Sequence, residues 1–233
     1  ITFCQPYDDT FKIIADIYTK YTKRLSDYEE SDDGQRPLEN LVDHLITFYW
    51  RSKLEIGDET LNEFYRYAPL KLRRHAIEFI GRSLGSTPNG LEENIETRLK
   101  GLYEWRQSQA DKTKEYEELE GFCWWVDADI MDKEWTLKKF HELLQVQDKL
   151  SALDFAARKL INYLDIDPVQ VLECMDLMLG KQNNQGMYFN WDDSAQDILR
   201  EALKIENVNE RAIDLVHKFG SRGYLQYRGL LNE

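Results

Sequence analysis

Cysteine and proline are scarce in this chain of 233 residues, and long apolar runs are missing. The three cysteines, Cys4, Cys123 and Cys174, never stand at a C-x-x-C spacing, which argues against a disulfide framework and against a thiolate metal cluster. No stretch reaches the roughly 18 apolar residues that a membrane helix needs, and no signal-peptide segment opens the sequence. We therefore expect a soluble protein from a reducing, cytoplasmic compartment.

Basic residues are also fewer than acidic ones. The chain has 30 Lys and Arg against 43 Asp and Glu, a net charge of -13. A general nucleic-acid binder neutralises phosphates with clustered Lys and Arg, and an anionic membrane surface repels a carboxylate surplus. We expect neither nucleic acid nor membrane as a partner. The acidic clusters at 27–43 and 115–134 would instead steer basic partners.

Apolar and aromatic residues are plentiful, at 42% and 12% of the chain, and their spacing is helical. Between 194 and 205 the apolar residues recur on one helical face, behind the capping candidates Asp192 and Asp193. A second stripe at 210–219 ends at Gly220. The short polar link between these stripes predicts two helices packed as an antiparallel hairpin.

The same hairpin pattern recurs at 152–179, broken at Pro168, and at 61–84, broken at Pro69. Further helices are predicted at 11–28, 38–50, 91–107 and 115–126, and after the capping residue Asp132. No stretch has the alternating pattern of a convincing strand.

An internal repeat links three of the predicted helices. The segments 76–80, 174–178 and 212–216 each read small, large, acidic, large, large, and 38 positions separate Cys174 from Ala212. That interval is close to the period of roughly 40 residues in helical-hairpin repeats. The prediction is an all-α chain forming an α-solenoid-like stack of antiparallel hairpins, with an irregular helical bundle as the alternative. Residues 1–233 would make a single domain, with a possible subdivision near 108–114.

Four catalytic or ligand-binding motifs are matched only in part. Gly81-Arg82-Ser83-Leu84-Gly85 fits G-x-S-x-G, but a nucleophile elbow needs a strand before the serine, and the residues before Ser83 are helical. A phosphate loop at 85–92 lacks its lysine, a zinc motif at 141–145 lacks its second histidine, and a calcium loop at 127–132 lacks its turn glycine. We predict no catalytic, cofactor-binding or metal-ligating residue and no cofactor.

Two groups of residues are candidate interaction surfaces. The first is a basic patch in an acidic chain, suited to an acidic peptide or a phosphate; its members are Arg66, Lys71, Arg73, Arg74 and Arg82. The alternative is a solvated helix face paired with Glu78. The second is Trp124 and Trp125, which could anchor a partner or could equally belong to the core.

With these residues identified, the chain shows two resemblances. Residues 67–81, echoed near Ala212, resemble HEAT or armadillo repeats. Trp124-Trp125 and the segment 220–225 are similar to C-terminal helical regions of very large bacterial NTPases of the defence type. The second resemblance implies a sensing or docking platform, and since the chain carries no NTPase motif it implies no activity. The start at Ile1 fits a fragment of a longer bacterial protein.

The function expected from the sequence is therefore a non-catalytic protein-interaction, scaffolding or sensing module. Its partner would be another protein or another domain of the parent chain. Two alternatives stay open: a metal-dependent hydrolase whose site is assembled from distant helices, and a local phosphate or nucleic-acid contact through Arg73 and Arg74.

Overall fold

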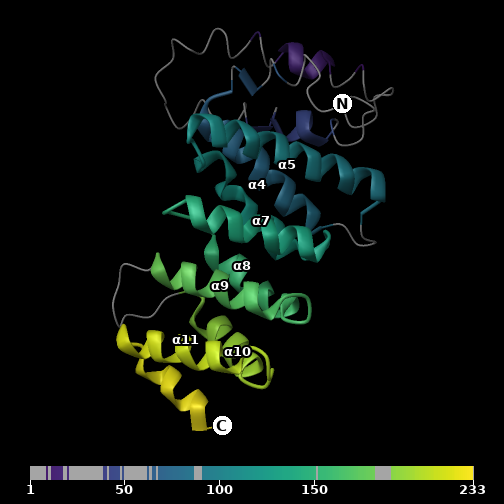
Figure 1. Ribbon diagram of the computed structural model, residues 1–233. Coiled ribbons are helices and arrows are strands. Elements are labelled where there is room, and N and C mark those ends of the chain that lie inside the picture. Colours follow the sequence, from purple (N-terminus) through teal and green to yellow (C-terminus); the bar gives the residue numbers. More distant parts are fainter. Residues whose placement is uncertain are drawn as a thin grey trace. The chain divides into compact units, whose positions relative to one another are not determined.

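The computed structural model describes most of the chain from residue 68 onward and isolated parts before it. The described residues are 9, 12–17, 20, 39, 40, 42–47, 49, 62, 65, 66, 68–86, 91–150, 152–181 and 190–232. Every regular element among them is a helix, and none of them lies in a strand (Figure 1). The all-α prediction is confirmed for these residues. The structure describes only parts of the helices predicted at 11–28, 38–50 and 61–68, and the described residues of these ranges are helical except Ala68.

The chain divides into two compact units. The first comprises Ile1–Ser83 and Thr87–Gly121, and the second comprises Leu84–Ser86 and Phe122–Glu233. The change of unit after Gly121 thus falls within the helical turn that follows α5. Residues 108–114, near which the sequence predicted a possible subdivision, all belong to the first unit: 108–113 lie inside α5 and Lys114 is its C-cap.

Two long helices and a short one form the described frame of the first unit: α4 (Leu70–Leu84), α5 (Glu93–Thr113) and the 3-10 helix η1 (Glu117–Phe122). Helix α4 buries Leu72, Ala76 and Ile80 on one face, as a 3.6-residue period requires. Helix α5 ends at Lys114, whose left-handed backbone (φ 61°) turns the chain while its N–H donates to Ala110 O. The turn leads directly into η1.

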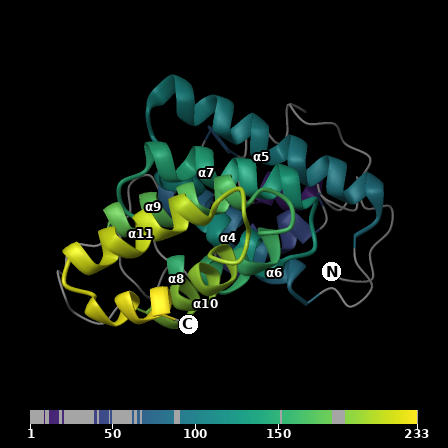
Figure 2. The ribbon, with the colours of Figure 1, turned by 60° about the horizontal axis from the view of Figure 1, so that its bottom comes forward.

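The second unit is built from two layers of helices. Its elements are α6 (Cys123–Ala128), α7 (Lys133–Val146), α8 (Leu153–Leu160), η2 (Ile161–Tyr163), α9 (Pro168–Gly180), α10 (Asp192–Ala202), α11 (Asn209–Ser221) and η3 (Leu225–Asn232). Helix α8 packs between α6 and α10, and α9 packs between α7 and α11. Figures 1 and 2 both show α7, α9 and α11 side by side. Across the layers, α6 contacts α7 and α10 contacts α11.

The repeat found in the sequence coincides with equivalent burial in the structure. Cys174 of α9 and Ala212 of α11, 38 positions apart, are both fully buried, and so are Met178 and Val216 one turn later. The acidic position between them, Asp176 or Asp214, points away from the core. Small buried residues at these points let neighbouring helices approach closely.

Polar contacts also join the neighbouring helices of the α7, α9 and α11 layer. Glu173 of α9 accepts from Arg211 of α11 at 3.0 Å and lies 3.5 Å from the ring of His141 in α7. Asp176 of α9 pairs with Lys218 of α11. The side chains of Glu173, Arg211, Asp176 and Lys218 are 38% to 49% exposed, so the two pairs between α9 and α11 contribute about 1 kcal/mol each at most.

One predicted helix cap is confirmed by the structure and another is wrong. Asp132 caps α7 as predicted, its carboxylate accepting from the Trp135 N–H at 2.7 Å. Asp192 does not cap α10: it is the first residue inside that helix, with Trp191 at the N-cap position. Its buried carboxylate accepts instead from the Tyr227 hydroxyl at 2.8 Å and so fixes η3. Local patterning cannot show that longer-range contact.

Candidate functional site

The first unit contains a cleft of about 280 Å³ next to helices α4 and α5. Arg73 comes from α4, Trp105 and Arg106 from α5, and Glu118 from η1. Tyr65 and Arg66, which precede α4, complete the main lining. Three arginines and two aromatic rings therefore border one cavity.

A buried ion pair forms one wall of this cleft. Arg106 Nε donates to Glu118 Oε1 at 2.5 Å, and Arg106 Nη2 donates to Glu118 Oε2 at 2.9 Å. The two side chains are only 7% and 4% exposed. Arg106 is buried because it continues the inward stripe of Leu99, Leu102 and Tyr103 along α5. The bidentate geometry offsets the desolvation of both charges.

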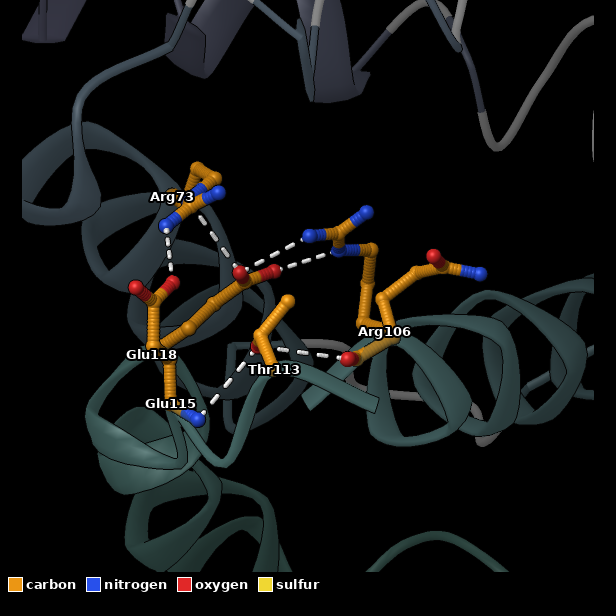
Figure 3. Close-up of polar contacts among 6 residues, drawn as sticks. Arg73, Arg106, Thr113, Glu115 and Glu118 are labelled. Carbon is orange, nitrogen blue, oxygen red and sulfur yellow. Dashed lines mark hydrogen bonds and ion pairs between the residues drawn. The ribbon is translucent and has the colours of Figure 1, made fainter. Parts of the chain in front are cut away.

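Arg73 approaches the same carboxylate from α4. Its Nε lies 3.2 Å from Glu118 Oε2, and its Nη2 lies 3.6 Å from Glu115 Oε2 (Figure 3). Within the described part of the chain, the buried Nε of Arg73 has no hydrogen-bond acceptor in good geometry. Arg73 is thus held by charge rather than by aligned hydrogen bonds, whereas Arg106 is held by both.

Aromatic rings fix the guanidinium group of Arg106. Its Cζ lies 4.3 Å from the centre of the Tyr65 ring and 4.8 Å from that of the Trp105 ring. The two rings meet edge to face, with centroids 5.2 Å apart. Cation–π contacts of this kind strengthen when the cation is desolvated, as it is here.

The charge of the cleft is opposite to that of the whole chain. Three lining arginines, Arg66, Arg73 and Arg106, face two lining carboxylates, Glu115 and Glu118, in a protein with a net charge of -13. Arginine is the side chain best suited to bind carboxylate or phosphate oxygens, because its donors form a planar fork. The arrangement can therefore receive an anionic group.

The structure distributes the predicted basic patch over several environments. Arg66 and Arg73 line the cleft, whereas Arg74 pairs with Glu120 at 3.1 Å and Arg82 pairs with Glu78 one turn earlier on α4. Lys71 is exposed on the same helix. The pairing of Arg82 with Glu78 agrees with the alternative from the sequence, in which these basic residues form a solvated helix face rather than an interaction surface. Only part of the patch therefore contributes to the cleft.

The two tryptophans belong to the packing of the second unit. Trp125 is fully buried and lies against Phe122 and Trp135, with ring centroids 5.4 Å and 6.3 Å away. It is a core residue, not part of a surface. Trp124 is half-buried, and its ring centre lies 4.0 Å from that of Phe155 in α8. Trp125 therefore corresponds to the core alternative, whereas Trp124 packs on Phe155 and stays partly exposed.

Sequence reasoning missed Arg106 and Glu118, the most buried charges of the cleft. The signal for Arg106 was its place on the stripe of α5, where a charged residue replaces an apolar one. Glu118 lies in the acidic run 115–120, which reads as a solvated segment when taken alone. The sequence gives no direct sign that the two residues meet.

Ser83, Cys123 and Cys174 lie in three different helices, α4, α6 and α9. Ser83 lies inside α4, so the helical context that argued against a nucleophile elbow is confirmed. Cys123 and Cys174 are buried, and burial raises the pKa of the Cys174 thiol. Within the described ranges, no group of three or more His, Cys, Asp or Glu residues is placed to hold a metal ion. The described residues also include no helix that combines the length and the apolar character needed to span a bilayer.

Comparison with known proteins gives no match: no family model, no curated protein sequence and no solved structure aligns with this chain. The geometry of the cleft therefore carries the functional argument.

Proposed function

We propose that the chain is a non-catalytic protein-interaction module and that its partner places an anionic side chain in the cleft of the first unit. The observation that carries this proposal is the local excess of arginine, with Arg106 fixed by burial, in a chain that is otherwise strongly acidic. The partner is another protein or another domain of the parent chain.

Preorganisation supports binding at this place. Arg106 is already desolvated, stacked on Tyr65 and Trp105, and anchored by Glu118, so little side-chain entropy remains to be lost when a ligand arrives. It supplies a fixed positive wall. Arg73 and Arg66 can then contact the partner, because Arg73 is held by ion pairs without aligned hydrogen bonds and Arg66 is exposed.

The second unit would serve as the scaffold or as a further docking surface. We propose that its three helical hairpins, α6 with α7, α8 with α9 and α10 with α11, form a short HEAT-like solenoid. The two-layer packing and the 38-residue interval between α9 and α11 support this assignment. The resemblance to helical regions of large bacterial NTPases makes a sensing or docking role in such a parent protein our proposal for its context.

A peptide-binding experiment on the full chain tests this function. The probe is a fluorescent peptide of ten glutamates, with ten lysines as the opposite-charge control, titrated at low and at high ionic strength. We expect the glutamate peptide to bind and to be released by salt, because exposed charges at the binding surface are screened. Arg73→Glu should weaken this binding by at least about tenfold, which corresponds to 1.4 kcal/mol.

The matched control is Lys71→Glu, which makes the same charge change two residues away on α4 but outside the lining of the cleft. A general electrostatic effect would weaken binding equally in both variants. Equal weakening, or no binding of the glutamate peptide to the wild-type chain, would contradict the proposal.

A further inference from the structure

Glu115 already occupies the outer edge of the cleft. Its carboxylate lies 3.6 Å from Arg73 Nη2, although its side chain is 59% exposed. The residue follows Lys114, the left-handed turn that ends α5, and its N–H reaches the Thr113 hydroxyl at 3.4 Å (Figure 3). The chain therefore holds a carboxylate of its own where an anionic ligand would approach Arg73.

This internal carboxylate and Glu118 differ in how firmly they are held. Glu118 is buried and makes two hydrogen bonds to Arg106. Glu115 makes one long ion pair at the surface, which contributes about 1 kcal/mol at most. Glu115 can be displaced by solvent or ligand, whereas displacement of Glu118 would leave the buried Arg106 without its counter-charge.

We propose that the cleft recognises a single phosphorylated serine or threonine of the partner, and that Glu115 is the built-in competitor that the phosphate displaces. The inference rests on the proposed function. A ligand carboxylate would exchange one carboxylate for another on Arg73 and would therefore gain less than a phosphate. A phosphate group carries a charge of about -1.5 to -2 and three acceptor oxygens, so the exchange is favourable.

The other groups at the cleft fit a phosphate. Arg73 has a guanidinium whose hydrogen bonds are not aligned with its present partners, so it can turn toward new acceptors. Gln109 lines the same cavity, and its side-chain amide can donate to phosphate oxygens. A guanidinium and an amide therefore border one place.

A polynucleotide is a poorer match than an isolated phosphate. The positive excess of the cleft is small, with three arginines against the two glutamates Glu115 and Glu118, and Glu117, next to Glu118 in the chain, is a further exposed carboxylate. Binding to a nucleic-acid backbone requires several phosphates to be neutralised along a continuous basic surface. The net charge of -13 opposes such an interaction beyond the cleft.

The test compares three forms of one neutral Gly/Ser peptide, carrying phosphothreonine, glutamate or threonine at its centre, by calorimetric titration of the full chain. We expect the phosphopeptide to bind at least about tenfold more tightly than the glutamate peptide, and the threonine peptide to bind more weakly than both. Arg73→Lys should weaken phosphopeptide binding, because lysine lacks the planar fork of donors.

Glu115→Gln separates this inference from a general preference for anions. Removal of the Glu115 charge should tighten binding of the glutamate peptide severalfold. The ratio of the affinities for the phosphopeptide and the glutamate peptide should therefore become smaller. Glu117→Gln makes the same charge change at an exposed position of η1 that does not line the cleft. It should leave the ratio of the two affinities unchanged.

Each opposing result has a distinct meaning. Equal affinities of the wild-type chain for the phosphopeptide and the glutamate peptide would overturn the phosphate assignment while leaving the interaction module intact. Identical effects of Glu115→Gln and Glu117→Gln would overturn the role of Glu115. Tighter binding of a short single-stranded RNA than of the phosphopeptide would overturn the single-phosphate assignment. If none of the anionic peptides bound, the proposed function itself would fail.

Discussion

At the scale of single residues, Glu118 is the charge on which the cleft depends. Its carboxylate is shared by Arg106, through two hydrogen bonds, and by Arg73, through an ion pair at 3.2 Å. Glu118→Gln keeps the shape of the side chain but leaves a buried guanidinium without a counter-charge. We expect the free energy of unfolding to fall by about 3 kcal/mol, as for other broken buried pairs.

Urea denaturation of the Glu118→Gln variant would measure this loss. The neighbouring Glu117→Gln is the matched control, since it removes an exposed charge from the same helical turn and should change stability by less than about 0.5 kcal/mol. If the two variants were equally stable, the ion pair would not hold η1 against α4 and α5.

His75 gives the stability of the first unit a pH dependence. Burial of the ring opposes protonation, but the hydrogen bond to Asp43 at 2.7 Å and the charge of nearby carboxylates outweigh it, so the pKa of His75 is raised. Because the folded chain binds this proton more tightly than the unfolded chain, the stabilisation is present below the ordinary pKa of about 6.5 and is lost as pH rises through the folded value.

The comparison that isolates this effect is wild type against Asp43→Asn. The wild type should have its largest advantage in the free energy of unfolding at about pH 5.5, and this advantage should shrink as pH rises toward about 8.5. An advantage that grew with pH would show that the sign of the linkage is wrong.

At the scale of elements, the close approach of η1 to α4 depends on a glycine. A Cβ added at Gly121 would lie 2.5 Å from the Glu78 backbone nitrogen and 2.9 Å from its Cα, and the backbone of a helix cannot easily move away. Gly121→Ala should therefore lower the free energy of unfolding by about 3 kcal/mol. Thermal or urea unfolding followed by circular dichroism measures the change.

Gly180→Ala is the matched control for this substitution. No heavy atom lies within 4 Å of a Cβ built at Gly180, the last residue of α9, so alanine should be tolerated there or should stabilise slightly. A loss at Gly121 no larger than that at Gly180 would mean that η1 can be moved away from α4 at little cost.

The last 3-10 helix is attached to α10 and α11 by Tyr227. Its ring stacks on Phe219 with centroids 4.1 Å apart, and its hydroxyl donates to the buried Asp192 carboxylate at 2.8 Å. Tyr227→Phe keeps the stacking and removes the hydroxyl. We expect a loss of about 2 kcal/mol, because the acceptor is a charged and buried group.

Tyr116→Phe provides the comparison, since the Tyr116 hydroxyl makes the same kind of bond to Asp111 at an exposed site, at 2.9 Å. That variant should lose far less stability. Burial and the Asp192 hydrogen bond also raise the pKa of Tyr227, so the stabilisation should persist up to about pH 10 and decline in more alkaline solution. The Tyr227→Phe variant should lose less stability over that alkaline range than the wild type.

The sequence could predict those features of the elements that depend on residues close together or periodic in the chain. The stripes of α10 and α11, the cap at Asp132 and the correspondence of Cys174 with Ala212 are local or periodic, and they were predictable. The bond from Tyr227 to Asp192 joins residues 35 positions apart. The cleft likewise needs α4, α5 and η1 to meet, and only tertiary structure brings Arg106 to Glu118.

At the scale of the whole molecule, net charge is the dominant electrostatic feature. With a net charge of -13, mutual repulsion disfavours the compact state, while the exposed ion pairs that oppose it are individually weak. We expect moderate salt to stabilise the chain, because screening weakens the summed repulsion more than it weakens these pairs. Denaturation midpoints measured in increasing sodium chloride would test this, and a steady fall would contradict it.

The ion pair between α9 and α11 depends on the order of these two helices in the chain. Glu173 and Arg211 occupy the same repeat position, 38 residues apart, but carry opposite charges. If the segment bearing α9 were duplicated in tandem, a glutamate would stand where Arg211 now stands, and two acids would face each other. Helices α9 and α11 are therefore not interchangeable: their order depends on the charges that they present to each other, so a tandem duplication of the α9 segment would require a compensating change of charge.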